Sequence, residues 1–235
     1  ANPTMTLGEL EQRCKTIRGV IEDNEYSAGM QRVIMERRTE WNPFVITPHY
    51  KNYLLVYSYM EDPNQSAFNG AGDIERLDKQ EAKLQVSLKV PLSEKDIFVP
   101  GDGFYAAFTM KAFWQVYNKD ISAPFRESNY RPEFYYITPL PDMFFEADTA
   151  LAIGIEHESN GRSQLLSRSW NRVFLNYYFS KDNYLISFRP WYRIPENKKD
   201  DPSDARGDDN PDIENYMGHF ELEATWENND FEYSM

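Results

Sequence analysis

The sequence predicts an all-β protein in which antiparallel strands form a barrel, and three observations support this prediction. From about residue 50 onward, apolar and polar residues alternate in long runs, as in strands with one apolar face. Aromatic residues make up 15% of the chain, with 16 Tyr and 15 Phe, which favours strands and membrane interfaces over an all-helical protein. Long and short connections roughly alternate, a pattern typical of membrane barrels.

The alternation predicts eight strands, and a ninth could begin at Phe231. The clearest run, residues 84–92, places Leu84, Val86, Leu88, Val90 and Leu92 on one face. Most of the runs reach the ~9–11 residues that a tilted strand needs to cross a bilayer. The expected strands cover residues 50–60, 80–92, 103–117, 129–138, 147–159, 168–180, 184–194 and 215–227.

The chain divides by composition into two parts. Residues 1–43 are charged and compatible with helical or irregular structure, and residues 44–235 carry the barrel pattern. Cys14 is the single cysteine, so no intrachain disulfide can form.

The overall charge excludes one class of partner. The net charge of −13 leaves no basic stripe that could neutralise phosphates, so we expect no nucleic-acid partner. A mean hydropathy of −0.70 would be typical of a soluble protein. A membrane barrel, however, needs only alternate residues to be apolar, so hydropathy alone does not decide the environment.

Two kinds of barrel fit the alternation. A transmembrane barrel turns its apolar face outward, and a soluble lipocalin-like barrel turns it inward. In the first, the charges of the polar face would pair inside a narrow lumen; in the second, they would be solvated. These charges are Lys83, Lys89, Lys111, Arg131, Glu133, Arg172, Glu221 and Glu223.

The alternating connections also predict which loops share one rim. If the longer loops lie outside the membrane, residues 61–78, 118–128, 160–167 and 195–213 lie at the same end of the barrel. Ser122 then lies at the rim that also carries His157 and Ser159.

A Ser–His–Asn set is the candidate for chemistry. His157 and Ser159 are two residues apart in an expected strand, so both point to the apolar face, as does Asn171 in the next strand. A serine hydroxyl is a weak nucleophile that needs an adjacent base, and the base needs an orienting group. A neutral orienting residue suits a site facing hydrocarbon, where a carboxylate is costly. A His-x-Ser pair alone is more often a surface or packing pair.

The longer string around this set is more specific. His157-Glu-Ser-Asn-Gly-Arg-Ser163, followed by Ser167-Arg-Ser-Trp-Asn-Arg172, resembles the signature of the outer-membrane phospholipase A family. The resemblance extends over roughly residues 30–235. Further matching segments are Asn42–Phe44, Trp114–Gln115, residues 122–130, Arg189–Tyr192, residues 210–213 and Tyr216–Gly218.

The resemblance implies a fold, an activity and a set of roles. The family consists of calcium-dependent esterases on a twelve-stranded antiparallel barrel in the outer membrane of Gram-negative bacteria, an even strand number as is usual there. They hydrolyse the acyl esters of membrane glycerophospholipids. By motif position, Ser159 would be the nucleophile, His157 the general base, Asn171 the orienting residue and Gly161 an oxyanion donor.

The resemblance also implies a metal and a partner. The family acts as a homodimer, with Ca²⁺ near the serine at the subunit contact. The ligands here would be the Arg162 carbonyl and the Ser167 hydroxyl of one subunit, with Ser122 of the other. Oxygen ligands of this kind are the ones Ca²⁺ prefers.

The sequence leads to two further expectations and leaves two alternatives open. Because only eight or nine strands are expected, the chain should be a C-terminally truncated form of the family barrel. The acidic residues of the last long loop should form a solvated loop and no specific ion site; they are Asp200, Asp201, Asp204, Asp208 and Asp209. Two alternatives to the enzyme remain, namely a non-catalytic outer-membrane barrel (a channel or structural protein) and a soluble lipocalin-like carrier.

Overall fold

The computed structural model describes residues 27–68, 76–141, 146–162, 166–201, 204, 207–228 and 231–235. Cys14, Ser163 and the first 26 residues of the predicted N-terminal segment lie outside the described residues.

Among the described residues, one antiparallel sheet accounts for nearly all regular structure, with four short helices around it. The helices are α2 (Ala28–Thr39), η1 (Gln65–Phe68), η2 (Lys119–Ile121) and α3 (Glu214–Met217). The strands are β1 (Tyr53–Tyr59), β2 (Gln80–Pro91), β3 (Gly103–Trp114), β4 (Phe125–Leu140), β5 (Asp148–Ser159), β6 (Ser169–Lys181), β7 (Tyr184–Ile194), β8 (Phe220–Asn228) and β9 (Phe231–Ser234).

The predicted eight strands and the ninth at Phe231 are confirmed, and their bounds differ most at the starts of β4 and β8. β4 begins at Phe125 and not at residue 129, because Phe125 still pairs with Trp114 of β3. The strand predicted from residue 215 begins at Phe220, because α3 precedes it and ends at Gly218, whose φ of 73° favours glycine. Alternation alone could not show that a helical turn interrupts this segment.

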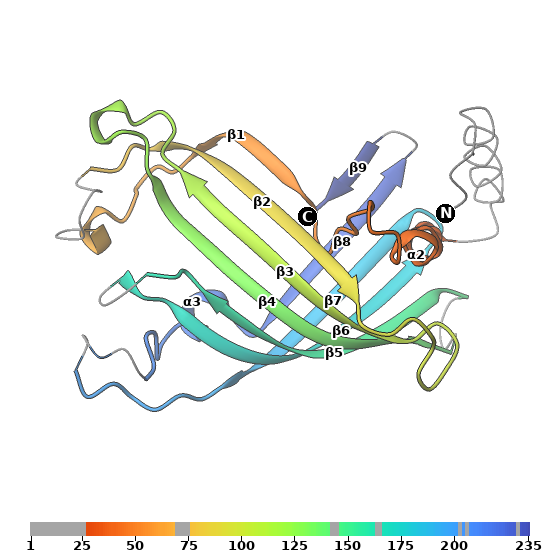
Figure 1. Ribbon diagram of the computed structural model, residues 1–235. Helices are drawn as coiled ribbons and strands as arrows, with labels where there is room; N and C mark the ends of the chain where they lie inside the picture. Colours follow the sequence, from red (N-terminus) through yellow and green to blue (C-terminus); the bar gives the residue numbers. More distant parts are fainter. Residues whose placement is uncertain are drawn as a thin grey trace.

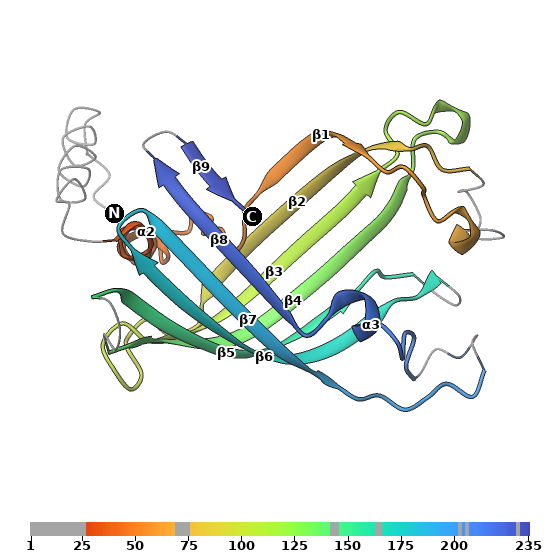
Figure 2. The same cartoon turned by 180° about the vertical axis from the view of Figure 1, so that it is seen from behind.

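Each strand pairs with its neighbour in the chain, in the order β1 to β9. The sheet curves into a trough whose two edges are β1 and β9 (Figures 1 and 2). Within the described residues these two strands do not pair with each other. Lys51, just before β1, connects the two sides through ion pairs to Glu223 in β8 (3.2 Å) and Glu232 in β9 (2.6 Å).

The connections fall at the two ends as the sequence predicted. Because neighbouring strands are antiparallel, the loops after β1, β3, β5 and β7 all lie at one rim, here called the site rim. The connection between β2 and β3 is long for the opposite rim. It folds around Asp102, whose buried carboxylate accepts hydrogen bonds from the backbone N–H groups of Ile97, Phe98 and Val99.

The apolar face of the sheet points outward. In β5, Ile153 and Ile155 are 49% and 53% exposed, whereas Glu156 between Ile155 and His157 is 4% exposed. The same inversion occurs in β6, where Leu175 is exposed and Arg172 is 1% exposed. A soluble lipocalin-like barrel requires the opposite arrangement, so that alternative is wrong and the membrane-barrel prediction holds.

The charges of the inner face pair with one another. Glu156 lies opposite Glu133 of β4 and opposite Arg172 of β6 in the strand register. Arg131 contacts both carboxylates, at 2.7 Å from Glu133 and 2.9 Å from Glu156, and Arg189 adds a contact of 2.5 Å to Glu156. Buried charges are tolerated only when paired in this way, so this cluster, the luminal ion network, holds the inner faces of β4 to β7 together.

The N-terminal part of the described chain also occupies the inside of the trough. His49 contacts Glu133 at 2.7 Å, and the Tyr50 hydroxyl donates to Glu133. Helix α2 lies at the rim opposite the site rim (Figure 1), where the Gly29 N–H donates to the Ser180 hydroxyl of β6. Among the described residues, no helix is long and apolar enough to cross a bilayer.

Gly154 of β5 is required by close packing on the inner face. A Cβ atom there would lie 2.5 Å from Tyr135 Cβ and 2.6 Å from the Phe134 carbonyl oxygen. We expect Gly154→Ala to destabilise the barrel by about 1–3 kcal/mol, the usual cost of overpacking. The measurement is electrophoretic mobility on a gel after heating. The temperature at which the protein changes from its folded to its unfolded mobility should fall. Gly103→Ala is the matched control, because its added Cβ meets only side-chain atoms at 3.2 Å and beyond; equal shifts in both variants would contradict the packing argument.

Candidate active site

His157 and Asn171 form a hydrogen-bonded pair on the outward face. They lie directly opposite each other in the register of β5 and β6. His157 Nδ1 is 2.9 Å from Asn171 Oδ1. A carbonyl oxygen only accepts hydrogen bonds, so Nδ1 carries the proton and donates it, and Nε2 keeps its lone pair. This is the tautomer that a general base needs.

Ser159 shares the outward face with His157 because it lies two residues further along β5. It lies opposite Tyr130 of β4 and Ser169 of β6. In the described part of the chain, its hydroxyl forms no hydrogen bond with His157. The structure therefore joins His157 and Asn171 by contact and places Ser159 beside them by strand geometry. Catalytic hydrogen bonds often form only once substrate is bound.

Glu196 is a further member of the site that the sequence analysis missed. The Asn171 amide donates through Nδ2 to Glu196 Oε1 at 2.8 Å. Asn171 lies opposite Ile194 in the register of β6 and β7, and Glu196 follows two residues after Ile194. Counting residues from the end of the predicted strand 184–194 would have placed Glu196 on the same face as Asn171.

The loop after β5 is held by Asn160. Its buried side chain accepts hydrogen bonds from the backbone N–H groups of Arg162 (3.2 Å) and Arg168 (3.0 Å), and donates to Glu127 and to the Leu166 carbonyl. The next residue, Gly161, has a φ of 64°, a left-handed conformation that glycine adopts without strain. We assigned no role to Asn160 from the sequence. Its position as a polar residue directly after Ser159, at the end of the strand, was the signal that could have identified it.

The predicted calcium ligands lie at the site rim, and Asp209 joins them. Ser167 and Ser169 both donate to Asp209 Oδ2, at 2.7 and 3.1 Å, and Lys199 forms an ion pair with the same carboxylate. Burial alone would raise the pKa of Asp209, but the contacts with Lys199, Ser167 and Ser169 lower it below its ordinary value. Hydroxyl, carbonyl and carboxylate oxygens together are a donor set that fits Ca²⁺.

Ser122 lies at the same rim as the other predicted ligands, in a different loop. It follows η2 in the loop between β3 and β4, with a φ of 61°. The hydrogen bonds of the described residues do not connect it to Arg162 or Ser167. No group of three or more His, Cys, Asp or Glu suited to a metal occurs among the residues that the structure describes.

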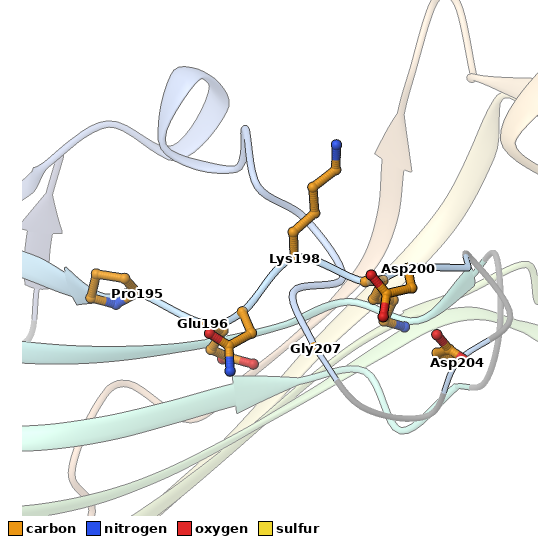
Figure 3. A pocket seen from close by; sticks show the side chains of 8 residues that line it. Pro195, Glu196, Lys198, Asp200, Asp204 and Gly207 are labelled. Carbon is orange, nitrogen blue, oxygen red and sulfur yellow. The ribbon is translucent and has the colours of Figure 1, made fainter.

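The acidic loop is only partly the solvated segment that was predicted. Asp200, Asp201 and Asp204 are exposed, as expected. The prediction is wrong for Asp208 and Asp209, whose side chains are each 10% exposed and anchored by Arg193 (2.6 Å) and Lys199. The loop surrounds an open cavity of about 820 Å³, lined by Pro195, Glu196, Asn197, Lys198, Lys199, Asp200, Asp204 and Gly207 (Figure 3).

Together, the fold and the site define a membrane-type β-barrel that carries a histidine–asparagine pair, with a serine beside it, on its outer wall. The sequence model of the family described as Phospholipase A1 matches residues 30–235. The chain belongs to this family.

Individual relatives agree with this membership. Phospholipase A1 of Escherichia coli (strain K12) is 37% identical over 183 residues, covering 77% of this chain and 59% of that protein. The Klebsiella pneumoniae protein of the same name is 36% identical over 188 residues, covering 79% and 61%. This chain thus spans about three fifths of the length of these curated relatives.

Solved structures show the same fold. Outer membrane phospholipase A from Escherichia coli superposes with a TM-score of 0.71 at 34% identity, over 81% of this chain and 75% of that chain. The Salmonella typhi outer membrane phospholipase, solved as a dimer with bound calcium, gives 0.74 at 34% identity, over 86% and 75%.

The anchoring role of Asp209 predicts the stability of its loop. In Asp209→Asn, the hydrogen bonds from Ser167 and Ser169 lose their charged acceptor, so the loop should open more often. We expect the Asp208 amide, which donates to the Asn197 carbonyl at 2.7 Å, to exchange its hydrogen roughly tenfold faster at pH 7, after correction for the intrinsic rate.

The pH dependence follows from the lowered pKa of Asp209. A carboxylate with a lowered pKa stabilises the folded loop at pH values above its ordinary range, and this stabilisation is lost as pH falls through the lowered pKa. The Asp208 amide exchange rates of wild type and Asp209→Asn should therefore become equal only at pH values below the ordinary carboxyl pKa range. Asp200→Asn is the control for loop charge; a difference between wild type and Asp209→Asn that vanishes already near neutral pH would argue against the anchor.

Proposed function

We propose that this protein is a calcium-dependent phospholipase of the Gram-negative outer membrane that hydrolyses acyl ester bonds of glycerophospholipids. The observation that carries this proposal is the His157–Asn171 hydrogen bond on an outward, apolar barrel face. A lipid acyl chain lying against Ile153 and Ile155 would bring its ester to the rim where Ser159 lies. The family membership supports the same activity.

The chain's residues account for the bond changes of ester hydrolysis. Ser159 Oγ attacks the acyl carbonyl carbon while its proton passes to His157 Nε2. The tetrahedral intermediate collapses, the ester C–O bond breaks, and His157 returns the proton to the departing lysophospholipid alkoxide. Water then attacks the acyl-serine ester while His157 takes its proton; the bond between the acyl carbon and Ser159 Oγ breaks, His157 returns the proton to Oγ, and the fatty acid leaves.

Asn171 supports both steps by holding the His157 ring. Its carbonyl accepts a hydrogen bond from the Nδ1–H group. This contact stabilises the imidazolium that forms when Nε2 is protonated. Gly161 follows Ser159 by two residues in the loop that Asn160 holds, and its N–H would donate to the oxyanion.

The donor set at the site rim fits Ca²⁺. The Arg162 carbonyl and the Ser167 hydroxyl would hold it from one subunit, and Ser122 from a second copy of the chain. When bound, Ca²⁺ supplies Lewis-acid stabilisation of the negative charge on the carbonyl oxygen. The calcium-bound dimer of the Salmonella typhi relative supports a homodimer as the active form.

A first prediction tests the catalytic residues. Ser159→Ala and His157→Ala should each lower kcat for phospholipid hydrolysis in detergent micelles with calcium by roughly 10³-fold or more, because the nucleophile and its base act as one unit. The heat-dependent gel shift should remain, which shows that the barrel is folded. Retained hydrolysis in Ser159→Ala would remove the mechanism and leave the non-catalytic outer-membrane barrel as the better description.

A second prediction tests the metal and the dimer. A chelator should abolish hydrolysis, and added Ca²⁺ should restore it. Ser122→Ala should raise the calcium concentration needed for half-maximal activity, because one ligand of the shell is lost. Mixing Ser122→Ala with Ser159→Ala should recover part of the activity, since one of the two sites in a mixed dimer then has all its residues. Failure of this mixture, with both variants folded, would count against ligands shared between subunits.

A further inference from the structure

The two ends of the Asn171 amide, Oδ1 and Nδ2, are similar in size, but one accepts hydrogen bonds and the other donates them. A rotation of its amide by 180° exchanges Oδ1 and Nδ2 with little change in packing. In the alternative orientation the amide would donate to His157 Nδ1, which would then have to be unprotonated. The ring proton would move to Nε2, and His157 could no longer take a proton from Ser159.

Among the described residues, Glu196 is the hydrogen-bond partner on the far side of this amide. Its Oε1 accepts from Asn171 Nδ2 at 2.8 Å. A carboxylate has no hydrogen to donate, so it can bind only the NH₂ end of the amide. This contact directs Oδ1 toward His157 Nδ1, 2.9 Å away. Within the described chain, the other hydrogen bonds and ion pairs do not involve the Glu196 carboxylate.

The fold holds Glu196 in place for this contact. Pro195 precedes it, which keeps Ile194 extended at the end of β7, and Ile194 pairs with Asn171 in the register. His157, Asn171 and Glu196 therefore form a row across β5, β6 and the end of β7. Glu196 is half-buried and lies in the wall of the cavity within the 195–209 loop (Figure 3).

We propose that Glu196 is a positioning residue that fixes the orientation of the Asn171 amide and, through it, the catalytically competent tautomer of His157. This inference rests on the proposed function, because it assigns His157 the role of general base. Glu196 touches neither Ser159 nor the ester; it acts through Asn171.

The tautomer is measured directly by the ¹⁵N chemical shifts of the His157 ring in the folded protein in detergent. The chain has three histidines, so comparison with His157→Gln assigns the signals. Wild type should show a protonated Nδ1 and an unprotonated Nε2. Glu196→Ala should shift the His157 population toward the Nε2–H tautomer, whereas Asp200→Ala, which removes an exposed carboxylate of the same loop, should not. An unchanged tautomer in Glu196→Ala would overturn the proposal.

Kinetics provide the second measurement. Glu196→Ala should lower kcat about tenfold with KM unchanged, the scale on which outer partners of functional histidines act. Glu196→Gln carries both an acceptor and a donor, so it can bind either end of the Asn171 amide and no longer selects one orientation; its kcat should lie between those of Glu196→Ala and wild type. A wild-type kcat in Glu196→Ala would overturn the proposal.

A double-variant comparison separates positioning from loop structure. Asn171→Asp replaces the amide by a carboxylate whose two oxygens both accept from His157, so no orientation needs to be fixed. In that background Glu196→Ala should cost no activity, and removal of the neighbouring like charge should increase it. An equal tenfold loss in both backgrounds would overturn the proposal in favour of a structural role.

These outcomes are distinguishable from failure of the proposed function. The ¹⁵N measurement needs no turnover, so it tests the contact even if the protein hydrolyses no phospholipid. Conversely, wild-type hydrolysis that depends on Ser159 but not on Glu196 would leave the proposed function intact and remove only this inference.

Discussion

The structure depends on one constraint, that the charges of the inner face neutralise one another inside the sheet. Glu133 and Glu156 lie opposite each other and would repel strongly if alone. Arg131 and Arg189 each contact both carboxylates, and Arg172 pairs with Glu156. A slip of one residue in the register would turn these charges into hydrocarbon and the isoleucines of β5 inward. The luminal ion network therefore fixes which face each residue occupies.

The register set inside the sheet places the site outside it. Glu156 faces Arg172 on the inner side, and the next residues, His157 and Asn171, face each other on the outer side. The Glu156–Arg172 pair and the His157–Asn171 pair are thus adjacent rungs of one ladder. Side chains placed by strands in this way are held more rigidly than those on loops. This explains how a hydrogen-bonded histidine can be maintained on a surface that faces lipid.

The loops of the site rim add hydrogen bonds that the strand pairing does not provide. Asn160 ties the backbone around Gly161, Asp209 gathers Ser167 and Ser169, and Glu196 reaches back to Asn171. The Asp209 and Glu196 contacts join segments distant in sequence, whereas Asn160 closes its own loop and also donates to Glu127 of β4. The strand ends place His157 and Asn171 side by side, and the loops hold the polar groups around them.

The sequence by itself determined the strand pattern, the shared rim of the longer loops and the common face of His157, Ser159 and Asn171, because a period of two residues and alternating connections are local properties of the chain. The motif resemblance led to the family. Periodicity could not decide whether the apolar face points in or out, since both barrels have the same alternation. Only the tertiary structure decided that, by burying Glu156 and Arg172. It also revealed Glu196 and Asp209, because their partners are brought close by strand pairing and loop folding and not by sequence spacing.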